Sequence, residues 1–390
     1  MPKNLVVCCD GTANEFKRDR TNVVKLCSAM IKDPARQLVY YHPGIGTMAA
    51  PGFVTGLGAF LARVAGQAFG YGLKDDIGAA YAFIMDHYCP GDRIYLFGFS
   101  RGAYTARAIA ALLHLYGRVP AGNEGLVPYA VRMFWAISKV HNTDKAAAYF
   151  KLAAQFKEAL GAPCPVHFVG LWDTVSSVGW IGSPVALAFT KTNPEINIAR
   201  HAVSIDERRA FFRTNLLSAA PGQDLQQVWF PGVHCDVGGG YREAESGLSK
   251  IALKWMADEA QASGLLLDAT QLQRILGKAA TTGTDGKDDN DPYMPPDPTA
   301  PMHRSLTPGW WPAEFLPKRY FDRTTDRVTW RMNLFRHRSM GVAPCVHDEA
   351  WNVSPAYAAK LPVDAVPLSK QFPKRPRKGG PRQDPAANVN

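Results

Sequence analysis

The sequence lacks several patterns that mark large classes of proteins. Its 390 residues contain no GxxxxGK[ST] motif and no self-similarity at a fixed period. These absences exclude a P-loop nucleotide site and the solenoid and propeller folds. The segment from Asp285 to Asp291 departs from EF-hand spacing, so no calcium site of that kind is predicted. We expect neither a metal nor another cofactor.

Paired cysteines and targeting signals are also missing. The seven cysteines are odd in number and none stands in a CxxC pair, which is typical of folding in a reducing compartment. The apolar run Leu5 to Cys9 is too short for a cleavable secretion signal. We therefore expect a chain that is cytoplasmic as synthesised, with no signal peptide and no transmembrane helix.

One charge-free stretch, Gly44 to Ala62, has the length of a membrane span. Its five glycines and Pro51 make it only weakly hydrophobic. We predict a surface loop with a short helix at this place.

Charge is sparse over most of the chain. Only 20% of the residues are charged against 46% hydrophobic, which excludes a disordered chain and indicates a folded, enzyme-sized protein. The formal net charge is +10, and residues 371–390 carry five basic side chains and one acidic one. This end has almost no large apolar groups, so it is predicted to be a flexible basic tail. Attraction of the tail to anionic lipid or nucleic acid is the less favoured interpretation, and no nucleic-acid partner is expected.

Short apolar runs alternate with helical patterns along much of the chain. The predicted strands are Leu5–Cys9, Leu38–Tyr41, Arg93–Phe97, Val166–Leu171, Ala202–Ile205 and Val228–Phe230. The predicted helices are Asp75–Tyr88, Tyr104–Tyr116, Asp144–Leu160 and Ser249–Ala262. This alternation is typical of an α/β fold with a mostly parallel sheet covered by helices on both faces. In such sheets ligands bind beyond the carboxyl ends of the strands, so the residues just after each run are the site candidates.

A GxSxG pentapeptide, Gly98 to Gly102, stands between a predicted strand and a predicted helix. That context is typical of a nucleophile elbow, in which small residues around the serine let the helix approach the strand. Ser100 is therefore the candidate nucleophile. A serine hydroxyl needs an imidazole to take its proton, and the imidazole needs a carboxylate to fix its tautomer.

Chain order in this fold should be serine, acid, histidine. Asp173 follows the strand that ends at Leu171, and His234 lies in a Gly-rich loop after Val228–Phe230, so both fit. Asp206 is a rival acid, although an ion pair with the arginines of Asp206-Glu207-Arg208-Arg209 is the plainer explanation for it. Rival bases lie downstream in less strand-like segments; they are His303 and His347.

An acyl-transfer site also needs two N–H donors for the oxyanion. The residue after the nucleophile, Arg101, supplies one from its backbone. The second is predicted in the loop after the first strand, where Gly11 permits unusual backbone angles and Thr12 follows it; a plain turn is the alternative. Asp10 and Asp236 are predicted to accept hydrogen bonds from loop N–H groups.

These motifs resemble those of a largely uncharacterised bacterial α/β-hydrolase domain family that includes the GxSxG phospholipase effectors of type VI secretion. The matching segments are Cys9–Thr12, Pro43–Thr47, Gly98–Arg107, Trp172–Val175 and Gly232–Tyr241. The resemblance covers residues 4 to about 320. It implies a Ser-Asp-His hydrolase of acyl esters in phospholipids, carried here by Ser100, Asp173 and His234.

The resemblance also shapes the expected organisation and partners. We expect an α/β-hydrolase-like catalytic core at 1–260 with a helical insertion around 118–160, a helical and loop-rich C-terminal extension at 261–370 packed on the core, and the tail at 371–390. Antibacterial effectors of this kind usually carry a large additional C-terminal module, whereas only about 70 residues follow the matched region here. The implied partners are an acyl lipid or ester substrate, a peripheral membrane contact and a secretion or immunity protein, with export by a type VI route.

The leading hypothesis is a serine hydrolase that cleaves carboxylic esters, in particular of phospholipid or another acyl lipid. Apolar residues after Asp173 are candidates for an acyl pocket, with a plain core helix as the alternative. They are Val178, Trp180, Ile181, Val185, Leu187 and Phe189. Two other hypotheses stay open: a soluble generic carboxylesterase, and a binding module whose hydrolase fold is catalytically idle.

Overall fold

A parallel sheet forms the centre of the molecule. The structure, a computed structural model, describes residues 2–11, 20–44, 69–139, 143–175, 179–180, 183–184, 187–278, 293–322 and 327–373. Within these ranges the sheet has eight strands in the order β12-β11-β8-β7-β4-β3-β1-β2, and every neighbouring pair is parallel. Its strands are β1 (Asn4–Cys9), β2 (Gln37–His42), β3 (Arg93–Phe99), β4 (Val166–Trp172), β7 (Ile196–Ser204), β8 (Asp224–Phe230), β11 (Cys345–Val346) and β12 (Val366–Pro367). The predicted α/β fold is thereby confirmed.

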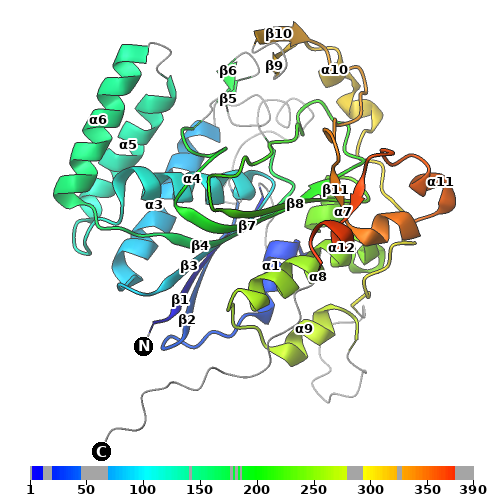
Figure 1. The fold of residues 1–390 in the computed structure, drawn as a ribbon, viewed down its shortest axis with the longest axis horizontal. Coiled ribbons are helices and arrows are strands. Elements are labelled where there is room, and N and C mark those ends of the chain that lie inside the picture. Colours follow the sequence, from blue (N-terminus) through cyan, green and yellow to red (C-terminus); the bar gives the residue numbers. More distant parts are fainter. Residues whose placement is uncertain are drawn as a thin grey trace, which may run out of the picture.

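Helices cover both faces of this sheet (Figure 1). On one face lie α3 (Phe69–His87), α4 (Arg101–Tyr116), α5 (Val127–Lys139) and α6 (Thr143–Leu160). The other face carries α1 (Asn22–Ala29), α8 (Gly247–Ala262) and α9 (Ala269–Ile275). The shorter elements are α7 (His234–Gly238), α10 (Trp311–Glu314), α11 (Pro355–Ala358), α12 (Leu368–Gln371), the 3-10 turns at 124–126, 243–245, 308–310 and 348–352, and the two-stranded pairs β5–β6 (Gly179–Trp180, Ser183–Pro184) and β9–β10 (Lys318–Asp322, Arg327–Arg331).

Successive residues of the central strands enter two separate cores. In β1, Leu5 and Val7 join the core under α3 and α4, while Val6 and Cys8 join the core under α1 and α8. Side chains alternate between the faces of a strand, so a strand buried on both sides must be apolar at every position. This is why the central strands are readable in the sequence as continuous apolar runs.

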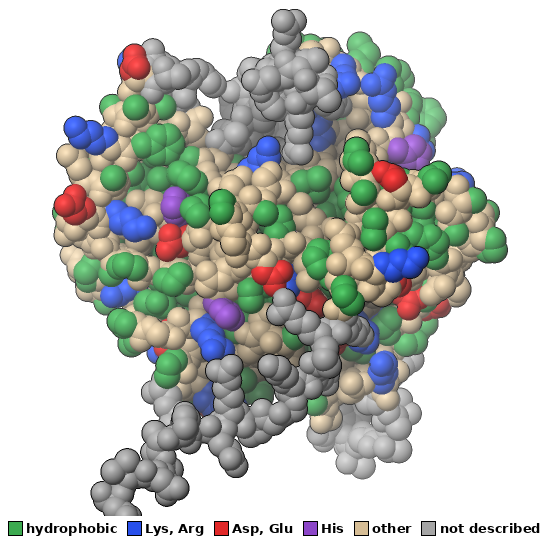
Figure 2. All heavy atoms as spheres, viewed as in Figure 1, with side chains coloured by type: hydrophobic (Ala, Val, Ile, Leu, Met, Phe, Trp, Pro, Cys, Tyr) green, Lys and Arg blue, Asp and Glu red, His purple; other side chains and the backbone are tan. Residues whose placement is uncertain are grey.

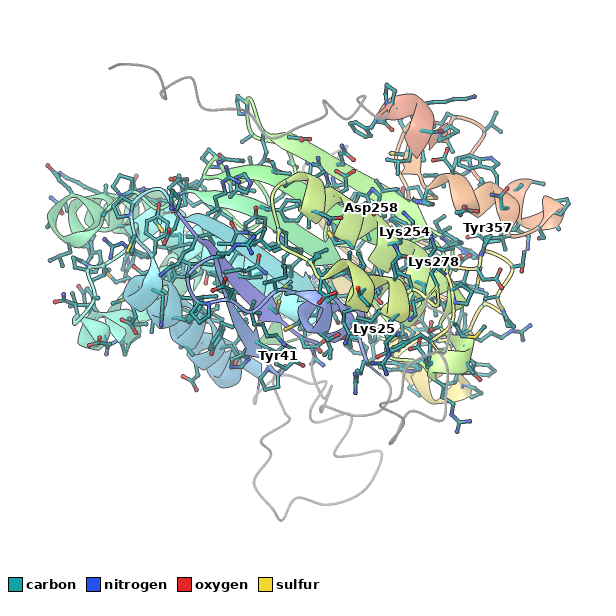
Figure 3. All side chains as sticks on the ribbon, turned by 90° about the horizontal axis from the view of Figure 1, so that it is seen from below. Lys25, Tyr41, Lys254, Asp258, Lys278 and Tyr357 are labelled. Carbon is teal, nitrogen blue, oxygen red and sulfur yellow. The ribbon has the colours of Figure 1, made fainter. Side chains whose placement is uncertain are left out.

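The helices on the outside show the complementary pattern. Helix α8 buries Ile251, Leu253 and Met256 against the sheet. Its outer side carries Lys254 and Asp258, which are one turn apart and form a partly exposed ion pair (Figure 3). An exposed pair of this kind adds only a few tenths of a kcal/mol, so the apolar face holds the helix in place.

The strand order changes direction beside β1. The chain adds β2 on one side of β1 and then β3 on the other. Connections that leave in opposite directions open a crevice at the carboxyl ends of two adjacent strands, where ligands bind in open α/β sheets. The end of β1 at Cys9 and the end of β3 at Phe99 therefore mark this crevice.

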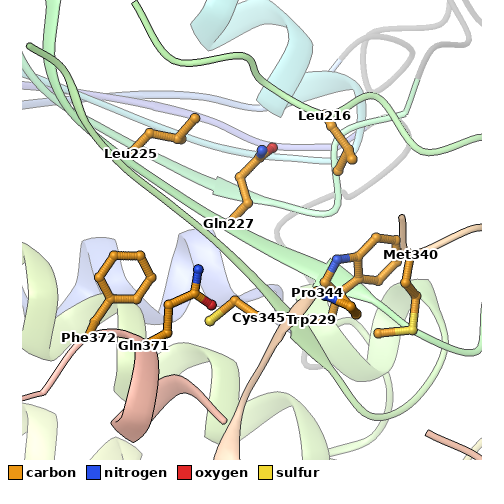
Figure 4. A pocket seen from close by; sticks show the side chains of 9 residues that line it. All are labelled: Leu216, Leu225, Gln227, Trp229, Met340, Pro344, Cys345, Gln371 and Phe372. Carbon is orange, nitrogen blue, oxygen red and sulfur yellow. The ribbon is translucent and has the colours of Figure 1, made fainter. Parts of the chain in front are cut away.

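The segment predicted as a C-terminal extension contributes to the sheet itself. Strands β11 and β12 extend it beyond β8, and Val203, Trp229 and Val346 share a third small core with this segment. The first residues of the predicted tail are anchored as well. Gln371 and Phe372 line a cavity of about 250 Å³ beside β8 and β11, and Phe372 packs against the core (Figure 4). Residues 374–390 lie outside the described residues, so their flexibility stays a prediction.

Helices α5 and α6 occupy the place of the predicted helical insertion at 118–160. They pack on α3 and α4 at one side of the molecule (Figure 1). A second cavity, of about 440 Å³, lies between α3 and α5 and is lined by Gly78, Val127 and Val131 among others.

On the surface, positive and negative side chains are interspersed rather than segregated on the face shown in Figure 2. Over the parts of the chain that the structure describes, no helix combines the length and apolar character needed to cross a bilayer. The seven cysteines are all unbridged.

Candidate active site

Ser100 occupies the turn between β3 and α4. Its backbone has φ 59° and ψ −118°, a conformation that costs a non-glycine residue about 1–3 kcal/mol and persists only where the surroundings impose it. The Ser100 N–H donates to the carbonyl oxygen of Trp172 at 3.0 Å, which ties the turn to the end of β4. The residue is 7% exposed.

The two glycines of the pentapeptide are required by close backbone contacts. A Cβ on Gly98 would lie 2.4 Å from the carbonyl oxygen of Gly102. A Cβ on Gly102 would lie 2.1 Å from the carbonyl oxygen of Cys9, at the end of β1. The start of α4 therefore presses against both its own strand and the loop after β1, which is the geometry of a nucleophile elbow.

The loop after β1 begins with Asp10, which accepts hydrogen bonds as predicted. Its carboxylate receives the Gly11 N–H at 2.7 Å, the Thr21 hydroxyl at 2.8 Å and the Tyr41 hydroxyl at 2.9 Å. The Gly11 N–H is thus directed at Asp10 in this structure. Thr12 lies outside the described residues. The second oxyanion donor stays a prediction, as does the backbone N–H of Arg101.

Asp173 follows β4 directly and is fully buried. Its backbone φ of 38° turns the side chain off the strand, and its N–H donates to the carbonyl oxygen of Ala202 at 2.7 Å. Four donors converge on its carboxylate. Oδ1 accepts from the Ser204 N–H at 2.9 Å and from Arg338 Nη1 at 2.6 Å, and Oδ2 accepts from His234 Nδ1 at 2.6 Å and from Arg338 Nη2 at 3.1 Å.

His234 meets Asp173 from the far side of the intervening strand β7. The sequence suggested a Gly-rich loop for this histidine, but it is the first residue of the short helix α7. Its ring lies 4.6 Å from the ring of Phe99 and 4.9 Å from that of Phe212, measured between centroids. Its backbone N–H donates to Glu207 Oε2 at 3.3 Å. Two aromatic rings and a carboxylate thus fix the position of the imidazole.

The electrostatics of the pair suit a neutral imidazole beside an ionised carboxylate. Burial alone raises the pKa of Asp173, but the guanidinium of Arg338 and the imidazole of His234 outweigh it and hold that pKa well below its usual range. Burial lowers the pKa of His234 from 6.5, and Asp173 offsets only part of this effect. Near neutral pH the imidazole is therefore available to accept a proton.

Asp206, the rival acid, forms hydrogen bonds with other groups, and the predicted ion pair between Asp206 and an arginine is wrong. Asp206 Oδ2 accepts from the Tyr357 hydroxyl at 2.6 Å and from the Gly232 N–H at 2.8 Å. The ion pair with an arginine belongs to the next residue, since Glu207 Oε2 lies 2.8 Å from Arg209 Nη2. Adjacent side chains leave the backbone in different directions, so the sequence alone cannot assign which acid of the run takes the arginine.

The rival bases are likewise held away from Asp173. His303 Nδ1 lies 2.6 Å from Asp236 Oδ1, and its ring stacks on Tyr241. His347 stacks on Phe230 at the start of a 3-10 turn. Asp236 also accepts the Val233 N–H at 3.0 Å, as predicted.

Two residues of the site escaped the sequence argument. Arg338 approaches Asp173 from a loop far downstream, and Glu207 supports the backbone of His234. No spacing pattern connects a lone arginine in an irregular segment to an aspartate 165 residues earlier. Within the described ranges, no three His, Cys, Asp or Glu side chains gather as a metal site would require.

Three of the six candidate acyl-pocket residues, Val178, Ile181 and Val185, lie outside the described residues, as do residues 45–62 of the charge-free stretch. Leu187 is buried in the core, and its N–H donates to the Tyr104 hydroxyl at 2.9 Å. Phe189 contacts the rings of His114 and Phe150. These two residues therefore serve packing.

Comparison with known proteins places this chain in a family. Residues 3–259 match the family described as "T6SS, Phospholipase effector Tle1-like, catalytic domain". The chain belongs to this family. The match includes the elbow, Asp173 and His234, and it ends before Arg338.

Individual relatives are longer than this chain. The uncharacterized protein YEL023C of Saccharomyces cerevisiae is 33% identical over an alignment of 231 residues that covers 56% of this chain and 33% of that protein. An uncharacterized protein from Pseudomonas aeruginosa is similar with a TM-score of 0.41 and 22% identity over 68% of this chain and 46% of the other. The Tle1 effector bound to the VgrG spike of the type 6 secretion system is similar with a TM-score of 0.37 and 19% identity over 64% and 53%. The chain thus spans one third to about half of the length of these relatives.

Proposed function

We propose that this Tle1-like domain is a serine hydrolase that cleaves carboxylic esters of acyl lipids, phospholipids among them. Ser100 is the nucleophile, His234 the base and Asp173 the residue that orients the base. The main observation behind this proposal is the buried contact of 2.6 Å between His234 Nδ1 and Asp173 Oδ2. It lies at the same end of the sheet as the strained Ser100 turn.

The contact assigns roles to the two nitrogens of His234. With Nδ1–H donated to Asp173, the other nitrogen, Nε2, is left to accept a proton. In the proposed reaction Ser100 Oγ attacks the ester carbonyl carbon as its proton moves to Nε2. The alcohol leaves with that proton, and the same nitrogen then activates water to hydrolyse the acyl-enzyme.

Stabilisation of the tetrahedral oxyanion falls to backbone donors. The Arg101 N–H follows the nucleophile at the start of α4, where the helix dipole also favours negative charge. The loop of Gly11 lies within van der Waals reach of that helix start through Cys9 and Asp10. A rotation that frees the Gly11 N–H from Asp10 would give the second donor.

Family membership supports the acyl-lipid substrate and suggests a secretion-related partner and a type VI export route. A peripheral membrane contact and an immunity partner belong to the same proposal. A generic carboxylesterase would use the same triad, so substrate length decides between the two. Each methylene of an acyl chain that the enzyme buries is worth about 0.8 kcal/mol, so kcat/KM should rise roughly 100-fold over four methylenes.

The experiment that tests the chemistry is labelling with a fluorophosphonate and mapping of the adduct by mass spectrometry. We expect the adduct on Ser100, no labelling of Ser100→Ala, and normal labelling of the control Ser138→Ala in α5. A folded Ser100→Ala protein that still hydrolyses esters would refute the mechanism.

Lipid specificity is tested separately with esters of increasing acyl length and with phospholipid vesicles. Rising kcat/KM and release of fatty acid from vesicles support the lipid hydrolase. A preference for acetyl esters without vesicle hydrolysis would leave a generic carboxylesterase.

A further inference from the structure

We propose that Arg338 is a positioning residue of this active site, which makes the C-terminal segment beyond the family's catalytic domain a working part of the catalytic centre. The inference rests on the proposed function. It assigns to Arg338 the task of holding the Asp173 carboxylate where it receives His234 Nδ1–H.

Arg338 reaches both oxygens of Asp173. Nη1 lies 2.6 Å from Oδ1, and Nη2 lies 3.1 Å from Oδ2. The same guanidinium donates to the hydroxyl of Ser204 at 2.7 Å and to the carbonyl oxygen of Phe212. A planar group bound at two points fixes the orientation of a carboxylate, which a single hydrogen bond cannot do.

A dedicated support holds the arginine in place. Glu314, fully buried, accepts the Asn333 side-chain amide at 2.6 Å and the Phe335 N–H at 3.0 Å. Leu334 and Phe335 have φ values of 50° and 59°, so this carboxylate stabilises a left-handed turn that starts the approach to Arg338. Arg208 donates to the Phe335 carbonyl oxygen from the other side.

Stability alone gives a poor reason for this arrangement. The Arg338 side chain is 6% exposed, and its Nε has no hydrogen-bond partner among the described residues. Burying two charges costs several kcal/mol each before their attraction is counted, so such pairs are often no better than apolar residues of similar size. A role at the site accounts for the arginine where folding energy does not.

Arg338 and a protonated His234 both interact with the single carboxylate of Asp173. When His234 is protonated, the carboxylate stabilises the imidazolium less than it would alone, because the guanidinium already neutralises it. The other charged groups that face His234 are Glu207 and Arg209, which form an ion pair with each other. We expect their charges to be unchanged in the Arg338 variants. Among the described residues, His201 of β7 and Cys235 of α7 are two further titratable groups that interact electrostatically with Asp173.

The test uses the full-length protein and a soluble ester, with kcat, KM and the pH profile as readouts. Arg338→Gln should lower kcat about 10- to 100-fold with little change in KM, the scale expected when a catalytic group loses its alignment. It should also move the acid limb of the profile up by about one pH unit, because Asp173 then acts fully on His234. Arg338→Lys should restore the acid limb but not the full kcat.

A matched control is Arg200→Gln. Arg200 is as buried as Arg338 and forms ion pairs with Asp224 and Glu259, yet it touches no member of the triad. The control should lose thermal stability without moving the acid limb. Equal shifts in both arginine variants would overturn the proposal, since they would report general destabilisation.

The proposal that Arg338 is a positioning residue would also be overturned if folded Arg338→Gln kept the wild-type kcat and the wild-type acid limb. If Arg338→Gln no longer melts cooperatively, the Arg338→Lys variant is used in its place. An unchanged kcat in Arg338→Lys would then refute a positioning role for Arg338. Failure of the wild-type protein to react with a fluorophosphonate at Ser100 would refute the proposed function instead, so the two failures are distinguishable.

Discussion

Replacement of Asp173 by asparagine should damage this protein in two ways that can be measured apart. The carboxylate receives four hydrogen bonds, two at each oxygen. An amide keeps only one oxygen, so its NH2 group must face two donors whichever way it is turned. The buried guanidinium of Arg338 then lacks a negative partner, which costs about 3–5 kcal/mol of folding free energy.

The catalytic loss is larger than the loss of stability. An asparagine NH2 that faces His234 favours the tautomer with the proton on Nε2, which cannot accept the serine proton. Turnover should fall about 10⁴-fold, which corresponds to about 5.4 kcal/mol of activation free energy. A domain stabilised by about 10 kcal/mol keeps about 5 kcal/mol or more after the substitution, so it stays folded and the two effects can be measured apart.

Asp206→Asn is the matched control. Its two contacts survive, because both donors meet Oδ2, and an amide turned with its oxygen at that position still accepts the Gly232 N–H and the Tyr357 hydroxyl. We expect a stability change of about 1 kcal/mol or less and near-normal turnover. Thermal melts and ester hydrolysis well below each melting temperature measure the two quantities. Greater loss of turnover in Asp206→Asn than in Asp173→Asn would refute the assignment of the acid.

Three further predictions follow from the same geometry. Gly102→Ala places a Cβ 2.1 Å from a backbone carbonyl oxygen of β1, so it should disrupt fluorophosphonate labelling, whereas Gly125→Ala, which meets open space, should label normally. Burial lowers the pKa of His234 from 6.5, so kcat/KM should reach half its maximum at a pH below 6.5, and a midpoint above that value would contradict the buried neutral imidazole. Truncation after Pro373 should preserve the melting temperature and the turnover on a soluble ester. Truncation after Leu368 removes the packed ring of Phe372 and should lower the melting temperature. Equal melting temperatures for the two truncated proteins would show that this ring contributes nothing to stability.

The sequence predicted the elements whose signal is local. Continuous apolar runs located the central strands because both faces of the sheet are covered, as at Leu5 to Cys9. The rule that sites follow strands then located Ser100, Asp173 and His234, although their catalytic roles stay predictions. Helix α1 was missed because its eight residues are too few for a clear period, even though Thr21 caps it.

Features fixed by distant contacts could not be predicted in this way. Strands β11 and β12 have two residues each, too few for any alternating pattern. The contact of Arg338 with Asp173 depends on a left-handed turn held by Glu314, and neither residue forms a local motif. Such contacts arise from the tertiary path of the chain.

The position of Arg338 in the chain has a consequence for the timing of activity during synthesis. Translation adds about 5–20 residues per second, and Arg338 follows His234 by about a hundred residues. On the proposed roles, a nascent chain holds its nucleophile, base and acid for roughly 5 to 20 seconds before the residue that aligns them is made. On these roles, the catalytic centre reaches full activity only after residue 338 has been synthesised and Arg338 has reached Asp173.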